Sequence, residues 1–119
     1  MEIFGIGTDI VEVKRLETLS EAFMQRCFTE REREKLKNKS AESVAGYFAA
    51  KEAVAKALGT GFAGFSPSAI EILHDKTGKP EVVLHASAAK IADDAEIKKI
   101  VLSISHCKSY ATATAVSQS

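Results

Sequence analysis

The chain has 119 residues, of which 45% are hydrophobic and 27% are charged, a composition typical of a globular protein and unlike that of a disordered one. Lysine and arginine number 16, as do aspartate and glutamate, so the basic excess of a general nucleic-acid binder is absent. Cys27 and Cys107 show neither a CxxC spacing nor a zinc-ligand pattern. We expect one domain over residues 1–119, located in the cytoplasm, because no apolar run spans a bilayer and no signal-peptide pattern is present.

The first predicted element is a strand over residues 2–13. Both of its faces are largely apolar, so we expect a central strand that is buried on both sides. Asp9 lies within it and shares a face with Gly5 and Gly7, two residues that leave space beside the carboxylate. Residues 14–24 follow as a short helical or turn segment.

Two helices come next. Residues 30–36 form the first, because Thr29 can cap it and Glu32 can complete a capping box. This helix is charged on nearly every side, so we expect it to be exposed to solvent. The main helix is predicted at residues 41–58, and Gly59 is suited to the left-handed position that ends it.

The rest of the chain reads as a loop, two hairpins and a helix. A glycine-rich loop at residues 59–68 precedes a hairpin at 69–84, an alanine-rich helix at 86–94 and a second hairpin at 98–116. The last strand carries alternating alanines, which permit close approach by a helix or by a neighbouring subunit. The predicted fold class is therefore α+β, with antiparallel strands and hairpins packed with one long helix and shorter helices.

Two carboxylates occupy unusually apolar positions. Aspartate is depleted inside strands, yet Asp9 has apolar neighbours on its face. Glu52 lies on a strip of small side chains of the main helix, with Ala49 and Ala55 one turn away. Each has an ordinary explanation as well, since Asp9 could cap a helix or pair with a lysine, and Glu52 could form a surface pair with Lys56.

Together, the two acids favour a magnesium ion, because they offer hard oxygen ligands and no His/Cys set with zinc spacing is present. Magnesium is typically held by one or two carboxylates, with substrate phosphates and water completing its octahedron. Lys51, Lys56 and the loop Gly59-Thr60-Gly61 are candidates to meet those phosphates. The loop would do so through its amides, since the dipole at a helix C-terminus repels anions.

His106 occupies the point where a strand enters a tight turn. It is either a hydrogen-bonded turn residue or a contact to an anionic group, in which case Lys108 would assist it. His74 and His85 stand in ordinary loop or strand-end positions, and the sequence assigns no role to either of them.

Four sequence blocks in this order resemble the holo-[acyl-carrier-protein] synthase family, the small bacterial phosphopantetheinyl transferases. The resemblance spans residues 2–116, and its second block is the most specific. The blocks are Gly5-Ile6-Gly7-Thr8-Asp9-Ile10-Val11-Glu12-Val13-Lys14-Arg15-Leu16, Phe48-Ala49-Ala50-Lys51-Glu52-Ala53 with Lys56-Ala57-Leu58-Gly59-Thr60-Gly61, Gly78-Lys79-Pro80, and Ser103-Ile104-Ser105-His106.

The resemblance implies that the chain moves the 4′-phosphopantetheine arm of coenzyme A onto a serine of apo acyl carrier protein and releases adenosine 3′,5′-bisphosphate. It implies that Asp9 and Glu52 are the Mg²⁺ ligands and that Lys56 meets the phosphates of coenzyme A. In the hypothesis that follows, Mg²⁺ polarises the β-phosphate and Lys56 neutralises the leaving bisphosphate. The serine loses its proton to Glu52 or to a metal-bound water.

The same resemblance implies the remaining contacts. The loop Gly59-Thr60-Gly61 would pack along the coenzyme, and His106, Lys79 and Pro80 would belong to the pocket for adenine and the 3′-phosphate. Lys14 and Arg15 match the basic start of the helix that receives the acidic carrier protein. The family forms homotrimers with active sites between subunits.

Two departures from the family pattern are present. Thr8 stands where the family usually has an apolar residue, and residues 62–66 lack the basic residue that relatives often carry after the glycine loop. The second departure leaves contacts to the 3′-phosphate to His106, Lys108 or a neighbouring subunit. Two alternative functions remain open, namely a coenzyme A pyrophosphate hydrolase and a non-catalytic module that binds nucleotide or carrier protein.

Overall fold

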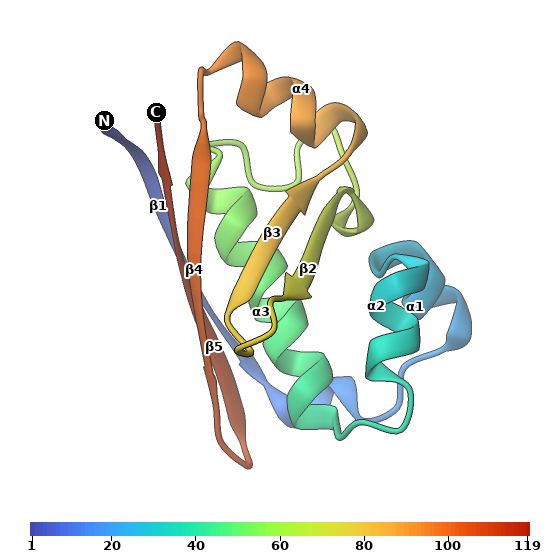
Figure 1. Ribbon diagram of the computed structural model, residues 1–119. Helices are drawn as coiled ribbons and strands as arrows, with labels where there is room; N and C mark the ends of the chain where they lie inside the picture. Colours follow the sequence, from blue (N-terminus) through green and yellow to red (C-terminus); the bar gives the residue numbers. More distant parts are fainter.

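The computed structural model describes residues 1–119, and its elements follow the predicted order (Figure 1). The strands are β1 (Ile3–Glu12), β2 (Ile70–His74), β3 (Pro80–Leu84), β4 (Lys99–His106) and β5 (Tyr110–Gln118). The helices are α1 (Glu21–Cys27), α2 (Glu30–Leu36), α3 (Ala41–Ala57) and α4 (Ala86–Asp94), with 3₁₀ turns η1 (Val13–Leu16) and η2 (Pro67–Ala69). The α+β prediction is confirmed, although residues 14–24 contain η1 and the start of a separate α1.

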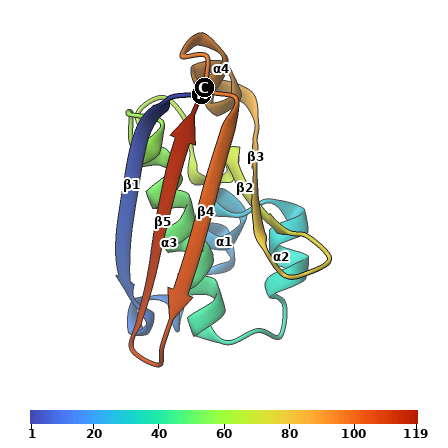
Figure 2. The same ribbon diagram turned by 60° about the vertical axis from the view of Figure 1, so that its left-hand side comes forward.

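Helix α3 lies at the centre of the molecule. A three-stranded antiparallel sheet of order β1-β5-β4 packs on one side of it, and the β2-β3 hairpin packs on the other (Figures 1 and 2). Because α3 has neighbours on both sides, it is buried around most of its circumference, and alanines fill most of those positions. The alternating alanines of β5 (Ala111, Ala113 and Ala115) are buried on the sheet face that meets α3, as the sequence predicted for close approach by a helix.

Strand β1 does not match its prediction as a central, buried strand. It is an edge strand that pairs only with β5, and it buries one face against α3. On its other face Phe4, Ile6 and Ile10 are 50%, 67% and 67% exposed, and Tyr110 of β5 adds a residue that is 48% exposed. The prediction failed because an apolar face has the same sequence pattern whether or not its own chain covers it.

Helix α2 lies on the outside as predicted, but it buries one of its charged residues. The capping box is present, with the Glu32 amide donating to the Thr29 hydroxyl at 3.2 Å and the Thr29 amide donating to the Glu32 carboxylate at 2.9 Å. However, Glu32 is only 1% exposed. Its carboxylate also accepts from the Lys51 ammonium at 2.7 Å and from the Ile72 amide at 2.8 Å, which satisfies the buried charge. None of the helices is both long enough and apolar enough to cross a membrane.

Candidate active site

Asp9, Glu52 and Lys56 come together where β1 packs on α3. Asp9 is on the inner face of β1, and Glu52 and Lys56 are one turn apart on α3. The Lys56 ammonium donates to the carbonyl oxygen of Thr8 at 2.9 Å and lies 3.4 Å from Oδ1 of Asp9. Lys56 thus pairs with the strand carboxylate, and not with Glu52 as a simple surface pair on the helix would require.

Glycines in β1 make this close approach possible. A Cβ atom on Gly7 would lie 1.9 Å from the carbonyl oxygen of Ala53 and 2.8 Å from Cβ of Lys56. A Cβ atom on Gly5 would lie 2.5 Å from the carbonyl oxygen of Ala57. Because any side chain at these positions would push the strand off the helix, the glycines hold Asp9 beside Glu52.

The electrostatics show that Glu52 is influenced by both charged neighbours, Asp9 and Lys56. Burial raises the pKa of Glu52, and the nearby negative charge of Asp9 raises it further, while Lys56 acts in the opposite direction. Two carboxylates that share a partly buried site repel each other when both are ionised, and a bound cation would relieve that repulsion. The chain offers no group of three or more His, Cys, Asp or Glu side chains that could hold a metal. The pair therefore suits an ion such as Mg²⁺, which takes its other ligands from substrate and water.

The glycine loop directly follows Lys56 and closes α3. Gly59 and Gly61 have φ angles of +88° and +59°, which residues other than glycine rarely adopt. The Gly59 amide donates to the carbonyl of Lys56 at 2.9 Å, and the Gly61 amide donates to the carbonyl of Ala55 at 3.1 Å. These two amides are already used to end the helix, so the loop is not an open amide nest for a phosphate. It is better suited to packing alongside a ligand.

Lys51 lies away from this site, in the interior of the protein. Its ammonium is fully buried and donates to Glu32 and to the carbonyl oxygens of Pro67 and Ile70. A lysine so placed cannot reach a phosphate at the surface. It joins α3 to α2 and to the chain that enters β2, which is a structural role.

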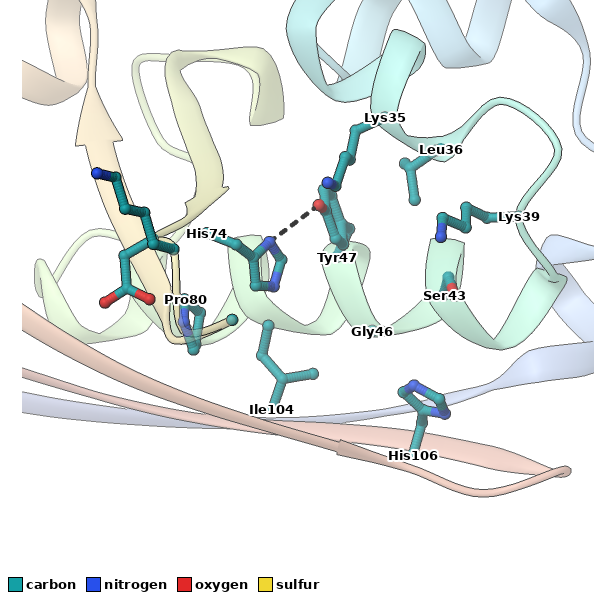
Figure 3. A pocket seen from close by; sticks show the side chains of 13 residues that line it. Lys35, Leu36, Lys39, Ser43, Gly46, Tyr47, His74, Pro80, Ile104 and His106 are labelled. Carbon is teal, nitrogen blue, oxygen red and sulfur yellow. Dashed lines mark hydrogen bonds between the residues drawn. The ribbon is translucent and has the colours of Figure 1, made fainter.

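A cavity of about 570 Å³ lies on the other flank of α3 (Figure 3). It is bounded by α2, α3, the β2-β3 turn and β4, and its walls include His106 and Pro80 but not Lys79. The basic side chains that line it are Lys35, Lys39, Lys76, His74 and His106. Sequence reasoning found His106 and Pro80 but missed the others, because they come from separate segments and each is ordinary in its local context.

The cavity carries a net positive charge, because Lys35, Lys39 and Lys76 outnumber its single carboxylate. Asp75 is the only acidic residue in its walls. Oδ1 of Asp75 accepts from the amide and the hydroxyl of Thr77 at 2.8 and 2.6 Å and from the amide of Lys79 at 3.0 Å. These bonds hold the carboxylate within its own hairpin turn, and they lower the pKa of Asp75. The cavity therefore favours an anionic ligand.

The carboxylate pair and the cavity lie at opposite edges of the sheet. Asp9 belongs to edge strand β1 and His106 to edge strand β4, with β5 between them. Asp9, Glu52 and Lys56 are absent from the walls of the cavity. Within one chain, the predicted metal site and the predicted nucleotide pocket are thus two separate half-sites.

The predicted carrier-protein contacts, Lys14 and Arg15, are both exposed in η1, just after β1 ends. They lie in this short 3₁₀ turn ahead of α1, and not at the start of that helix. Arg26 of α1 adds a further cation, 5.7 Å from the ring centre of Phe23.

Comparison with known proteins agrees with the resemblance seen in the sequence. Residues 5–115 match the family model of the 4′-phosphopantetheinyl transferase superfamily. The chain is 51% identical over 121 aligned residues to holo-[acyl-carrier-protein] synthase of Caldanaerobacter subterraneus subsp. tengcongensis, covering 98% of this chain and 94% of that protein. The chain belongs to the holo-[acyl-carrier-protein] synthase family. As a member of that family it is an enzyme of the phosphopantetheinyl transferase class.

Crystal structures of holo-[acyl-carrier-protein] synthases have the same fold. The structure from Neisseria meningitidis superposes with a TM-score of 0.91 at 37% identity, covering 99% of this chain and 100% of that one. The structure from Helicobacter pylori, in complex with coenzyme A, has a TM-score of 0.84 at 32% identity and covers 95% of this chain and 99% of that one.

Proposed function

We propose that this chain transfers the 4′-phosphopantetheine arm of coenzyme A to a serine of apo acyl carrier protein and releases adenosine 3′,5′-bisphosphate. The observation that carries the proposal is the convergence of Asp9, Glu52 and Lys56 at the contact between β1 and α3. The names of relatives supply the substrates, since these are acyl-carrier-protein synthases and one of them was crystallised with coenzyme A.

Asp9 and Glu52 are the residues that would hold Mg²⁺. Held there, such an ion would draw charge off the phosphate oxygens of the substrate. Lys56 lies beside the same carboxylates, where its ammonium stabilises the charge of the departing bisphosphate. The proton of the attacking serine passes to Glu52 or to a water held at the same site.

The adenosine end of coenzyme A would occupy the basic cavity, with His106 and Pro80 in its walls, Lys79 at its edge and the loop Gly59-Thr60-Gly61 along the coenzyme. Because the two half-sites lie at opposite edges of one sheet, a complete site combines the β1 edge of one copy with the β4 edge of another. We propose a homotrimer in which the exposed face of β1 contributes to the contact between copies.

The carrier protein would dock beside β1. Lys14 and Arg15 follow that strand directly and offer positive charge to an acidic partner. The proposal also includes a cytoplasmic location and a role in fatty acid biosynthesis. An acidic protein surface placed here would bring its serine to the end of β1 that is nearer to Asp9.

The decisive experiment is a mass spectrum of apo carrier protein after incubation with this protein, coenzyme A and Mg²⁺. Transfer adds about 340 Da to the carrier, the mass of one phosphopantetheine delivered by metal-assisted phosphoryl chemistry. A chelator in the same mixture should prevent the gain. Steady release of bisphosphate from coenzyme A without carrier protein would instead identify a pyrophosphate hydrolase. Tight coenzyme A binding that is indifferent to Mg²⁺, without any product, would identify a binding module.

A further inference from the structure

Tyr47 and His74 form a hydrogen-bonded pair in the wall of the basic cavity. The Tyr47 hydroxyl and Nδ1 of His74 are 3.2 Å apart, and the ring centres are 5.6 Å apart with the planes tilted by 33° (Figure 3). Tyr47 comes from α3 and His74 from the last position of β2, so the pair joins two walls of the cavity. Tyr47 is only 7% exposed, whereas His74 is open to solvent.

When the Tyr47 hydroxyl donates to Nδ1, that bond determines which edge of the imidazole can donate outward. Burial, together with the negative charge of Glu32, raises the pKa of Tyr47, so its hydroxyl stays protonated and can donate to Nδ1. A neutral imidazole that accepts at Nδ1 carries its proton on Nε2, and a protonated imidazole carries one there as well. In both states His74 presents an N–H donor on the edge of the ring that faces away from Tyr47.

The surroundings of His74 favour a phosphate monoester attached to a flat apolar group. Lys35, Lys39 and Lys76 supply positive charge, while the one carboxylate in the walls is held in its own turn. Pro80 and Ile104 supply apolar surface. Gly46 lets β4 approach α3 closely at this wall, since a Cβ atom on residue 46 would lie 3.2 Å from the Ile104 side chain.

We propose that Tyr47 orients His74 so that Nε2–H donates to the 3′-phosphate of coenzyme A. The pair thereby makes this enzyme prefer coenzyme A over coenzyme A that lacks the 3′-phosphate. The inference rests on the proposed function for the identity of the substrate. His74 contacts the ligand, and Tyr47 is a positioning residue that acts through it. The pair supplies a contact to the phosphate that residues 62–66, which contain no basic side chain, do not provide.

The test is the ratio of kcat/KM for coenzyme A to kcat/KM for dephospho-coenzyme A. Both substrates meet the same active molecules, so partial misfolding of a variant leaves this ratio unchanged. His74→Ala should lower the ratio about 10- to 100-fold, the range expected for one hydrogen bond to a charged group. Tyr47→Phe, which keeps the ring and removes the hydroxyl, should lower it about 3- to 10-fold, since only orientation is lost. His74→Gln, which retains an N–H donor near the position of Nε2, should keep a higher ratio than His74→Ala.

His85→Gln is the matched control, because His85 is also exposed but hydrogen-bonds to Glu71 outside the cavity. Its ratio should equal that of the wild type. An unchanged ratio in His74→Ala would overturn the inference and leave the transfer reaction intact.

Nucleotide binding separates this inference from the proposed function. In calorimetry without carrier protein, the wild type should bind adenosine 3′,5′-bisphosphate more tightly than adenosine 5′-monophosphate, and His74→Ala should lose most of that difference. If this holds while no transfer occurs, the pair stands and the proposed reaction is wrong. Equal affinity of the wild type for both nucleotides would overturn the inference even if transfer occurs.

Discussion

Lys51 and Glu32 form an ion pair of 2.7 Å in which neither side chain is exposed to solvent. The pair connects α3 to α2. The same ammonium also donates to the backbone carbonyls of Pro67 and of Ile70, the first residue of β2. Burial lowers the pKa of Lys51, and the charge of Glu32 counteracts that effect. Every hydrogen-bonding group of the pair is satisfied, since no buried side-chain polar atom in the chain lacks a partner.

Lys51→Met should destabilise the protein by about 3–5 kcal/mol, because it leaves the Glu32 carboxylate buried without its cation. The free energy of unfolding in urea measures this. The double variant Lys51→Met/Glu32→Gln should recover part of the loss, since the uncompensated charge is then gone. A single variant within about 1 kcal/mol of the wild type, the typical worth of an exposed pair, would contradict the assigned structural role.

Gly7→Ala should separate β1 from α3, because the added Cβ atom would lie 1.9 Å from the carbonyl oxygen of Ala53. Overpacking of this kind costs about 1–3 kcal/mol of folding stability. It should also lower transfer activity, since Asp9 moves away from Glu52. Thermal unfolding and the carrier mass spectrum give the two readouts. Thr8→Ser, a change on the opposite face that keeps the hydroxyl, is the control and should affect neither.

Asp9→Ala and Glu52→Gln should each reduce transfer about 1,000-fold or more, because several kcal/mol of transition-state stabilisation depend on the metal and its ligands. Both variants should remain folded by circular dichroism. Near-normal turnover by Asp9→Ala in saturating Mg²⁺ would refute the metal assignment.

Glu52→Gln also has a predicted stability signature. The pKa of Glu52 is raised in the folded protein, so the stabilisation associated with its protonated form is complete below the unfolded pKa of about 4.5 and is lost as pH rises through the folded value. In a metal-free buffer at neutral pH, Glu52→Gln should therefore be at least as stable as the wild type. Added Mg²⁺ should raise the Tm of the wild type and not that of the variant. Clear destabilisation of the variant in metal-free buffer would contradict the assigned repulsion.

Glu71 should make the protein resistant to mild acid. Its burial acts to raise the pKa, but hydrogen bonds from Arg31, Thr29 and His85 outweigh this and lower the pKa to about 2. Because the pKa of Glu71 is lowered in the folded protein, its ionised form stabilises the fold at pH values above the unfolded pKa of 4.5. This stabilisation is lost as the pH falls toward 2. Arg31→Ala should move acid unfolding, followed by circular dichroism, to higher pH. Lys90→Ala, which removes an exposed pair on α4, should leave it unchanged.

Two variants that are inactive alone should recover activity when their chains assemble together. Asp9→Ala damages the β1 edge of a chain and His106→Glu places negative charge in the cavity at the β4 edge. If complete sites form between copies, trimers assembled from an equal mixture recover activity at about a quarter of their sites. Co-expression followed by the transfer assay measures this, with each variant alone as the control. Mixed trimers without activity would show that each chain builds its own site.

The sequence predicted the type of nearly every element because caps, glycines and apolar periods are local signals. The capping box of Thr29 and Glu32 and the alternating alanines of β5 are examples. It could not predict that β1 is an edge strand. Outward-facing isoleucines give the same sequence pattern whether or not a second layer of the same chain covers them. Nor could it pair Glu32 with Lys51, because these residues are 19 positions apart and lie on two different helices.

The sequence likewise predicted only part of the candidate site. Asp9 and Glu52 stood out because each is an acid in an apolar setting, and the structure brings them together with Lys56. The basic cavity was only partly foreseen. Lys35, Tyr47 and His74 have no local feature that marks them, and only the packing of α2, α3 and the β2-β3 turn brings them to one place.

The two faces of β1 carry unrelated tasks, with the odd-numbered Asp9 directed toward α3 and the even-numbered Ile6 and Ile10 directed outward. Successive side chains of a strand alternate in direction, so deleting a single residue ahead of Asp9 would exchange the two sets. The pairing with β5 has an irregularity between Ile3 and Gly5 and is continuous from Gly5 onward. Changes of length should therefore be tolerated only before that irregularity. Beyond it, one lost residue would misplace both the carboxylate proposed to hold the metal and the face proposed to meet another copy.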